Sequence, residues 1–175
     1  VGIGGSPDDF ETAAKHNPNV PVFSGETYPG WLTHWGEAWQ RPDTNELKQQ
    51  LEFLLKNDKS FNFYVIHGGT NFGFTAGANA FSPTQYQPDI TSYDYDAPIN
   101  EQGRATPKYD MLRRLIQQYV AEPLPDVPAP IKTIAIPAFE MKRGLNLWNY
   151  IRYSRHEPQP KPMESFGQNQ GIVVY

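Results

Sequence analysis

Hydrophobic residues recur along this chain at two spacings, and each spacing predicts a different kind of element. Short apolar runs at residues 20–25 and 61–66 indicate buried strands. Leucines that repeat every three to four residues after Asp43 predict a helix ending near Asn57, because this spacing puts them on one helix face. The repeating residues are Leu47, Leu51, Leu54 and Leu55.

Capping signals predict where the helices begin. Ser6 followed by Pro7 is typical of a helix start, and we expect this first helix to end at about Lys15. Asp43 with Glu46 three residues later resembles a capping box. Thr106 and Pro107 begin a third predicted helix, with an inward face made of Met111, Leu112, Leu115, Ile116 and Tyr119.

The resulting order is helix, strand, helix, strand, helix. This alternation predicts an α/β fold with a parallel sheet and flanking helices. The stretch 68–105 has no clear period, so we expect one long loop, and loops of that length are commonly functional or disordered.

The composition changes after residue 122. The stretch "EPLPDVPAPIK" contains four prolines and predicts an extended linker over residues 123–138, after a first domain at residues 1–122. We expect residues 139–175 to be the truncated start of a β-rich domain. Short β segments are predicted around Ile134, Ile136, Phe139, Leu145 and Leu147. The chain begins and ends within what read as strands, so we expect it to be part of a longer polypeptide.

Charge and composition exclude several functions. The formal net charge is −4, so the chain has no basic footprint for nucleic acid. It has no cysteine, which excludes disulfides and cysteine-based zinc sites, and no apolar run of about 18 residues that could span a membrane. The sequence does not fix the compartment; we favour a secreted, periplasmic, lysosomal or vacuolar location over a cytoplasmic one.

The candidate chemistry gathers where the two predicted strands end. Glu26 follows the first strand and is crowded by aromatic residues, among them Trp31. The second strand runs into a loop that carries Tyr93, Asp94, Tyr95 and Asp96. In parallel α/β folds, functional groups meet at the carboxyl ends of the strands. Carboxylates, tyrosine hydroxyls and flat aromatic faces together suit a sugar.

Each of these features also has a plain structural interpretation. A carboxylate beside tryptophans is, by itself, more commonly a capped loop residue, and the glycines of "GGTNFG" could simply form a tight turn. The "YDYD" motif lacks the glycine and the regular oxygen ligands of a calcium loop. The histidines have no metal-ligand spacing and are expected to be structural or at the surface; they are His16, His34, His67 and His156. We therefore expect no metal and no cofactor.

Three motifs carry a resemblance to a known family. The stretches "SGETYPGWLTHWGEAW", "NFYVIHGGTNFGFTAGAN" and "TSYDYDAPINEQGRATPKYDMLRRLI" resemble, in order and spacing, glycoside hydrolase family 35, the β-galactosidases. The resemblance implies a (β/α)₈ TIM barrel, of which this chain would carry the last two strands and the last helix before a linker into a β-rich region. The rest of the barrel would then be its partner.

The resemblance also implies roles for single residues. Glu26 would be the nucleophile of a retaining exo-β-galactosidase that removes terminal β-galactose. Tyr64 and Tyr95 match tyrosines that hydrogen-bond the galactose or the nucleophile. Tyr93, Trp31 and Asn71 match positions that line the pocket.

The family's acid/base glutamate lies in an "NE" motif on an earlier barrel strand, and no such pair precedes Glu26 in this sequence. Two alternatives therefore stay open. The chain could be a catalytically inactive galactose-binding module, or part of another exo-glycosidase of the same family.

Overall fold

The computed structural model describes residues 2–82, 84–142, 144–149, 152, 158–159, 161 and 163–171. The chain divides into two compact units, Val1–Ile131 and Lys132–Tyr175. This division lies within the stretch 123–138 that the prolines predict as a linker.

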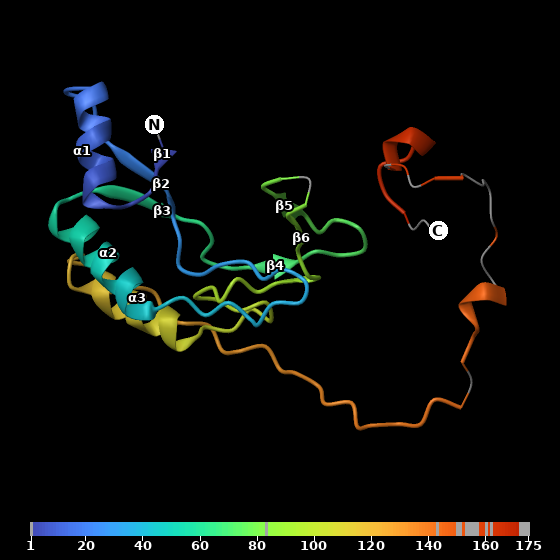
Figure 1. Cartoon of the computed structure of the whole chain (residues 1–175). Coiled ribbons are helices and arrows are strands. Elements are labelled where there is room, and N and C mark those ends of the chain that lie inside the picture. The colour runs from blue at the N-terminus through green and yellow to red at the C-terminus, as the bar shows by residue number, and fades with distance from the viewer. Residues whose placement is uncertain are drawn as a thin grey trace. The chain divides into compact units, whose positions relative to one another are not determined.

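The first unit is an α/β structure built on a parallel sheet (Figure 1). Strand β1 (Gly2–Ile3) pairs with β2 (Phe23–Thr27), and β2 pairs with β3 (Ser60–Phe63). Helix α1 (Pro7–His16) connects β1 to β2, and α2 (Thr44–Lys56) connects β2 to β3. The predicted parallel α/β fold is confirmed. The third strand, β1, lies at the start of the chain, which reads as part of a strand, although its two residues are too few to show a period.

Helix α1 begins at the predicted N-cap. The Ser6 hydroxyl accepts a hydrogen bond from the Asp9 backbone N–H at 3.2 Å, and the Asp9 carboxylate accepts one from the Ser6 N–H at 3.2 Å. This reciprocal pair satisfies two backbone donors that the first helical turn leaves free. Asp43 caps α2 differently from the prediction, because its carboxylate accepts from the Asn45 N–H at 2.8 Å rather than sharing a capping box with Glu46.

The hydrophobic core lies between α2 and α3 (Pro107–Gln117), which run side by side (Figure 1). It consists of Leu47, Leu51, Leu112 and Leu115, with Phe61 and Phe63 of β3 packed against it. Burial of each leucine contributes roughly 1.5–3 kcal/mol. Tyr119, predicted to face inward, is exposed because α3 has already ended at Gln117.

The burial predicted for the first strand is wrong in part. Val20 precedes β2 and is 60% exposed, and Phe23 is 45% exposed. The buried side chains of β2 are Ser24 and Thr27, whose hydroxyls lie 3.0 Å apart. β2 is irregular between Ser24 and Thr27, so burial does not simply alternate along this strand. The second strand was also placed too late, since β3 already ends at Phe63.

The predicted long loop 68–105 contains four short strands. β4 (Gly69–Thr70) pairs antiparallel with β7 (Ser92–Tyr93), and β5 (Ala78–Ala80) pairs antiparallel with β6 (Tyr86–Pro88). The β4–β7 pair brings Tyr93 and the residues after it back toward the end of β3. Strands of two or three residues leave no periodic signature in the sequence.

In the second unit, the structure has two short 3₁₀ turns, η1 (Leu147–Asn149) and η2 (Met163–Phe166). Residues Ile134, Ile136, Phe139 and Leu145 lie in irregular, exposed backbone, and Leu147 begins η1, so the β segments predicted at these positions are wrong. A strand needs a paired neighbour to be stable, and none of these described residues has one. Residues 150–151, 153–157 and 172–175 of the expected β-rich region lie outside the described residues.

No helix in the described ranges combines the length and the apolar character needed to cross a membrane.

Candidate active site

Glu26 lies near the carboxyl end of the middle strand of the sheet. It is the fourth of the five residues of β2, and its side chain is exposed. The hydroxyl of Tyr28 donates a hydrogen bond to Glu26 Oε2. This hydrogen bond is the main cause that raises the pKa of Tyr28 above its ordinary value, followed by burial. Tyr28 therefore stays protonated and remains a hydrogen-bond donor to the carboxylate.

Five aromatic rings form a continuous group beside Glu26, which we call the aromatic cluster. Its members are Tyr28, Trp31, Tyr64, Tyr93 and Tyr95. The Tyr28 ring centroid lies 5.7 Å from that of Trp31 and 6.2 Å from that of Tyr64. The Tyr95 centroid lies 6.0 Å from that of Tyr64 and 5.3 Å from that of Tyr93. Residues from three distant stretches of sequence thus meet around one carboxylate.

Two tyrosine hydroxyls of the aromatic cluster, those of Tyr93 and Tyr95, are kept neutral. Burial is the main cause that raises the pKa of Tyr93 and of Tyr95 above the ordinary value. The Tyr93 hydroxyl also lies 3.4 Å from that of Tyr64. Neutral phenols can both donate and accept hydrogen bonds.

Tyr95 carries an unusual buried hydroxyl. The residue is only 3% exposed, and its hydroxyl has no hydrogen-bond partner among the described residues. Buried polar groups are normally paired, because leaving one unpaired costs roughly 1–3 kcal/mol. A polar group in this position is typical of a binding site rather than of a packed core.

Two glycines allow the loop that carries Tyr93 and Tyr95 to approach the strand ends. A Cβ atom at Gly30 would overlap the carbonyl oxygen of Tyr95, and one at Gly68 would overlap the carbonyl oxygen of Tyr93. The close approach lets the Trp31 N–H donate to the Tyr95 carbonyl at 3.0 Å. Any other side chain at these two positions would push the aromatic cluster apart.

Asn71 has contacts of another kind. Its backbone N–H donates to the Thr91 carbonyl at 2.7 Å, and its side-chain Nδ2 donates to the Ile90 carbonyl at 3.2 Å. The contacts of Asn71 join it to residues 90–91 of the same loop. The predicted site residues that the structure brings together are Glu26, Trp31, Tyr64, Tyr93 and Tyr95.

Tyr28 was missed as a site residue by the sequence analysis. The signal was present, because Tyr28 lies only two residues after Glu26, directly beyond the end of β2.

Other carboxylates near the site are engaged in structural contacts. Glu37 lies 2.8 Å from Nδ1 of the buried His34, and hydrogen bonds from the side chain and backbone of His34 lower the pKa of Glu37. Glu101 accepts hydrogen bonds from Thr70 and, at 2.5 Å, from Ser92.

The histidines that the structure describes behave as expected. His34 is buried and structural, and Asn79 Nδ2 lies 3.0 Å from its Nε2. His16 and His67 are exposed, while His156 lies outside the described residues. In the parts of the chain that are described, no three acidic or histidine side chains are grouped closely enough to hold a metal ion.

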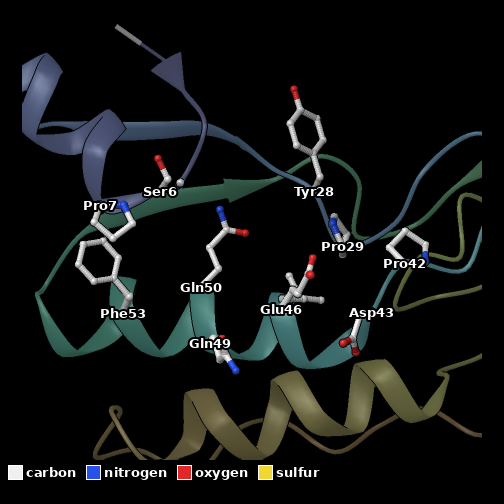
Figure 2. A pocket seen from close by; sticks show the side chains of 12 residues that line it. Ser6, Pro7, Tyr28, Pro29, Pro42, Asp43, Glu46, Gln49, Gln50 and Phe53 are labelled. Carbon is white, nitrogen blue, oxygen red and sulfur yellow. The ribbon is translucent and has the colours of Figure 1, made fainter.

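A cavity of about 500 Å³ lies between the start of α1, the end of β2 and the helix α2 (Figure 2). Gln50 extends from α2 toward the strands, whereas the ring of Tyr28 points away from α2. Tyr28 and Pro29 border this cavity, but Glu26 does not line it. The cavity is therefore distinct from the face on which Glu26 meets the aromatic cluster.

The Tyr28–Glu26 contact predicts a measurable change in titration. Replacing Glu26 with glutamine should lower the pKa of Tyr28 toward its ordinary value, because both the hydrogen bond to the carboxylate and its negative charge raise that pKa. NMR of ¹³Cζ-labelled tyrosine, with Tyr28→Phe to assign the signal, measures this. An unchanged Tyr28 titration in the Glu26→Gln variant would show that the two side chains are not in contact.

Comparison with known proteins places this site in a family. The family model for glycosyl hydrolases family 35 matches residues 2–119. A "Beta-galactosidase" of Xanthomonas manihotis is 37% identical over 168 residues, which cover 95% of this chain and 28% of that protein. "Beta-galactosidase 17" of Arabidopsis thaliana is 41% identical over 175 residues, which cover 95% of this chain and 25% of that protein. "Beta-galactosidase-1-like protein 3" of Homo sapiens is 36% identical over 178 residues, which cover 96% of this chain and 27% of that protein.

The chain thus spans about a quarter of the length of the curated relatives that it matches. The family match extends from β1 through α3 and includes Glu26 and every member of the aromatic cluster. On this evidence, the chain belongs to family 35 of the glycosyl hydrolases.

Proposed function

We propose that this chain supplies the nucleophile and part of the galactose pocket of a retaining exo-β-galactosidase, which releases terminal β-galactose. The observation that carries the proposal is the position of Glu26. It lies at the carboxyl end of a parallel strand, accepts a hydrogen bond from Tyr28, and is bordered by the aromatic cluster. The relatives named β-galactosidases agree with this choice of sugar.

In the proposed reaction, Glu26 attacks the anomeric carbon and forms a covalent galactosyl intermediate. A retaining enzyme needs a second carboxyl group about 5–5.5 Å away, which protonates the leaving oxygen and later activates water. We assign that group to a part of the protein outside this chain. Tyr28 donates a hydrogen bond to Glu26 and so orients the attacking carboxylate.

The aromatic cluster has two tasks in this proposal. Its rings provide flat apolar faces for the C–H side of the pyranose and exclude water, which strengthens electrostatic stabilisation of the transition state. Its neutral hydroxyls provide donors for the sugar hydroxyls. The Tyr95 hydroxyl has no partner among the described residues, so its hydrogen-bonding capacity is not already used within them.

We further propose that β1, β2 and β3 are consecutive strands of a (β/α)₈ barrel. The three strands are parallel, and α1 and α2 alternate with them along the chain, as in that architecture. In a closed barrel, the face of β2 that carries the exposed Phe23 would pack against side chains of the other strands.

The Tyr95→Phe variant is expected to lower kcat/KM for a galactoside by about 5- to 150-fold, equivalent to a lost hydrogen bond of roughly 1–3 kcal/mol. Thermal stability should stay the same or rise, since the change removes a buried hydroxyl that has no described partner. Tyr64→Phe should also lower kcat/KM. Steady-state kinetics and thermal unfolding on the same preparations measure both effects.

The matched control is Tyr86→Phe, which removes the same hydroxyl from an exposed tyrosine of β6. It should leave the kinetics unchanged. Wild-type kinetics for both Tyr95→Phe and Tyr64→Phe would contradict the assignment of these residues to the galactose pocket.

The experiment that tests the proposed function is a substrate panel. The full-length protein that carries this sequence is assayed with nitrophenyl β-galactoside, β-glucoside and β-mannoside. NMR identifies the anomer of galactose that is released first. Hydrolysis of the galactoside with initial release of β-galactose supports a retaining β-galactosidase. Preference for another sugar, or initial release of the α-anomer, would overturn the proposal.

A further inference from the structure

Lys108 is a buried cation at the start of α3. It is the second residue of that helix and is only 6% exposed. Its Nζ donates to the Pro29 carbonyl at 2.6 Å, to the Asp96 carbonyl at 2.6 Å and to Asp96 Oδ2 at 2.7 Å. An ammonium group has three donors, so these three bonds use all of them.

These bonds join the two segments that form the aromatic cluster. Pro29 directly follows Tyr28, the partner of Glu26, and Asp96 directly follows Tyr95. The segments already touch where the Trp31 N–H meets the Tyr95 carbonyl. Lys108 thus adds a fixed, charged connection next to the point where the nucleophile and the pocket tyrosines meet.

The backbone at this connection needs support. Tyr95 and Asp96 have φ angles of +64° and +50°. These angles lie in the left-handed region, which residues other than glycine rarely adopt. Such conformations are strained and persist only where their surroundings fix them. The Asp96 carboxylate is fixed from two sides, by Lys108 Nζ and by Arg41 Nη1 at 2.6 Å.

We infer that Lys108 and Asp96 form a positioning pair that sets the distance between Glu26 with Tyr28 and the hydroxyl of Tyr95. The inference rests on the proposed function, because it concerns the geometry of that reaction. Neither side chain has to touch the sugar. The pair acts through the backbone of Pro29 and of Asp96, which hold the two sides of the pocket at one separation.

The expected size of the effect follows from the demands of the reaction. A displacement of about 1 Å at a reacting group can lower a rate by about 10²-fold. Without the ammonium group, the Pro29 and Asp96 carbonyls lose their buried donor, and the Asp96 carboxylate keeps only Arg41. We therefore expect the strained turn at Tyr95 to relax and the two segments to separate.

The test uses the Lys108→Met variant of the full-length protein, which keeps an apolar stem of similar length and removes the charge. The matched control is Lys48→Met on α2, where the lysine side chain is 51% exposed and pairs with Glu52 at 3.8 Å. Each protein is reacted with a 2-deoxy-2-fluoro-β-galactoside that has a good leaving group, and mass spectrometry measures the rate constant of labelling and the final labelled fraction.

A positioning role and a merely structural role give different results. If Lys108 is a positioning residue, the Lys108→Met protein should be labelled to completion, with a rate constant about 10²-fold lower than that of the wild type. The Lys48→Met protein should be labelled at the wild-type rate. A reduced labelled fraction with an unchanged rate constant would mean that Lys108 only stabilises the fold, and it would overturn the inference. Complete labelling at the wild-type rate would also overturn it.

Asp96→Asn provides a second, milder variant in case Lys108→Met does not fold. It keeps the shape of the side chain and an oxygen acceptor for Lys108 but removes the charge. Its labelling rate should fall by about tenfold at an unchanged final fraction, because a charge-assisted hydrogen bond becomes a neutral one. A wild-type rate in this variant would overturn the inference. If the wild-type protein itself neither labels nor hydrolyses galactosides, the proposed function fails and the inference fails with it.

Discussion

Replacing Glu26 with glutamine is expected to lower the hydrolysis of β-galactosides by roughly 10⁴-fold or more, since an amide cannot form the glycosyl ester. The fold should be retained. Glu26 is exposed, and a glutamine oxygen can still accept the hydrogen bond from Tyr28. Kinetics of the full-length protein with nitrophenyl β-galactoside, together with thermal unfolding, measure both expectations.

The matched control is Glu37→Gln. Glu37 is the next carboxylate along the chain after Glu26, but its side chain is held by His34 at 2.8 Å. This variant should keep the rate within a few-fold of the wild type, because Glu37 has no part in the proposed chemistry. A loss in Glu37→Gln that equals the loss in Glu26→Gln would contradict the assignment of the nucleophile.

The second large effect concerns the 175-residue chain by itself, which is expected to hydrolyse no β-galactoside at a measurable rate. A retaining reaction needs a proton donor besides the nucleophile. Three carboxylates on the neighbouring loops have other partners: Asp96 pairs with Lys108, Glu101 binds Ser92, and Glu37 binds His34.

The isolated chain is also expected to associate with itself. β1 and β3 are the two edges of a three-stranded sheet, and unpaired strand edges favour pairing with another chain. The exposed Phe23 adds an apolar surface on β2. Light scattering and a nitrophenyl galactoside assay on the purified chain test both points.

A monodisperse monomer with sharp thermal unfolding would contradict the expected association. Turnover by the isolated chain that disappears in Glu26→Gln would contradict the expected inactivity. It would mean that another carboxylate, such as Glu37 or Asp94, acts as the proton donor.

Local signals in the sequence were enough to predict the helices. The N-cap at Ser6 and the one at Thr106 both hold in the structure, and the leucines at helical spacing form the core between α2 and α3. Caps and helical faces involve residues within a few positions of one another. Their physics can therefore be read from a short window of sequence.

Features that depend on distant partners could not be predicted in this way. The observed strand bounds differ from the predicted ones because pairing with neighbouring strands decides where a strand ends. The hairpin of β5 and β6 is too short to show a period in the sequence. Nothing in the sequence around Lys108 indicates that its ammonium group reaches Pro29, which lies 79 positions away.

The candidate site was predicted largely from the resemblance of its motifs to a family. Residues alone indicated a carboxylate among aromatic rings at a strand end, which left a plain capping role open. The structure adds the hydrogen bond from Tyr28, the buried hydroxyl of Tyr95 and the ion pair at Asp96. Each is a contact between side chains whose orientation only the folded chain sets.

The central claim is that Glu26 attacks the sugar, and covalent labelling tests it most directly. The full-length protein is inactivated with a 2-deoxy-2-fluoro-β-galactoside, digested, and analysed by mass spectrometry to locate the added sugar. We expect one adduct per molecule, on Glu26, and none in the Glu26→Gln variant. A stable adduct on Glu37, Asp94 or any residue other than Glu26 would contradict it.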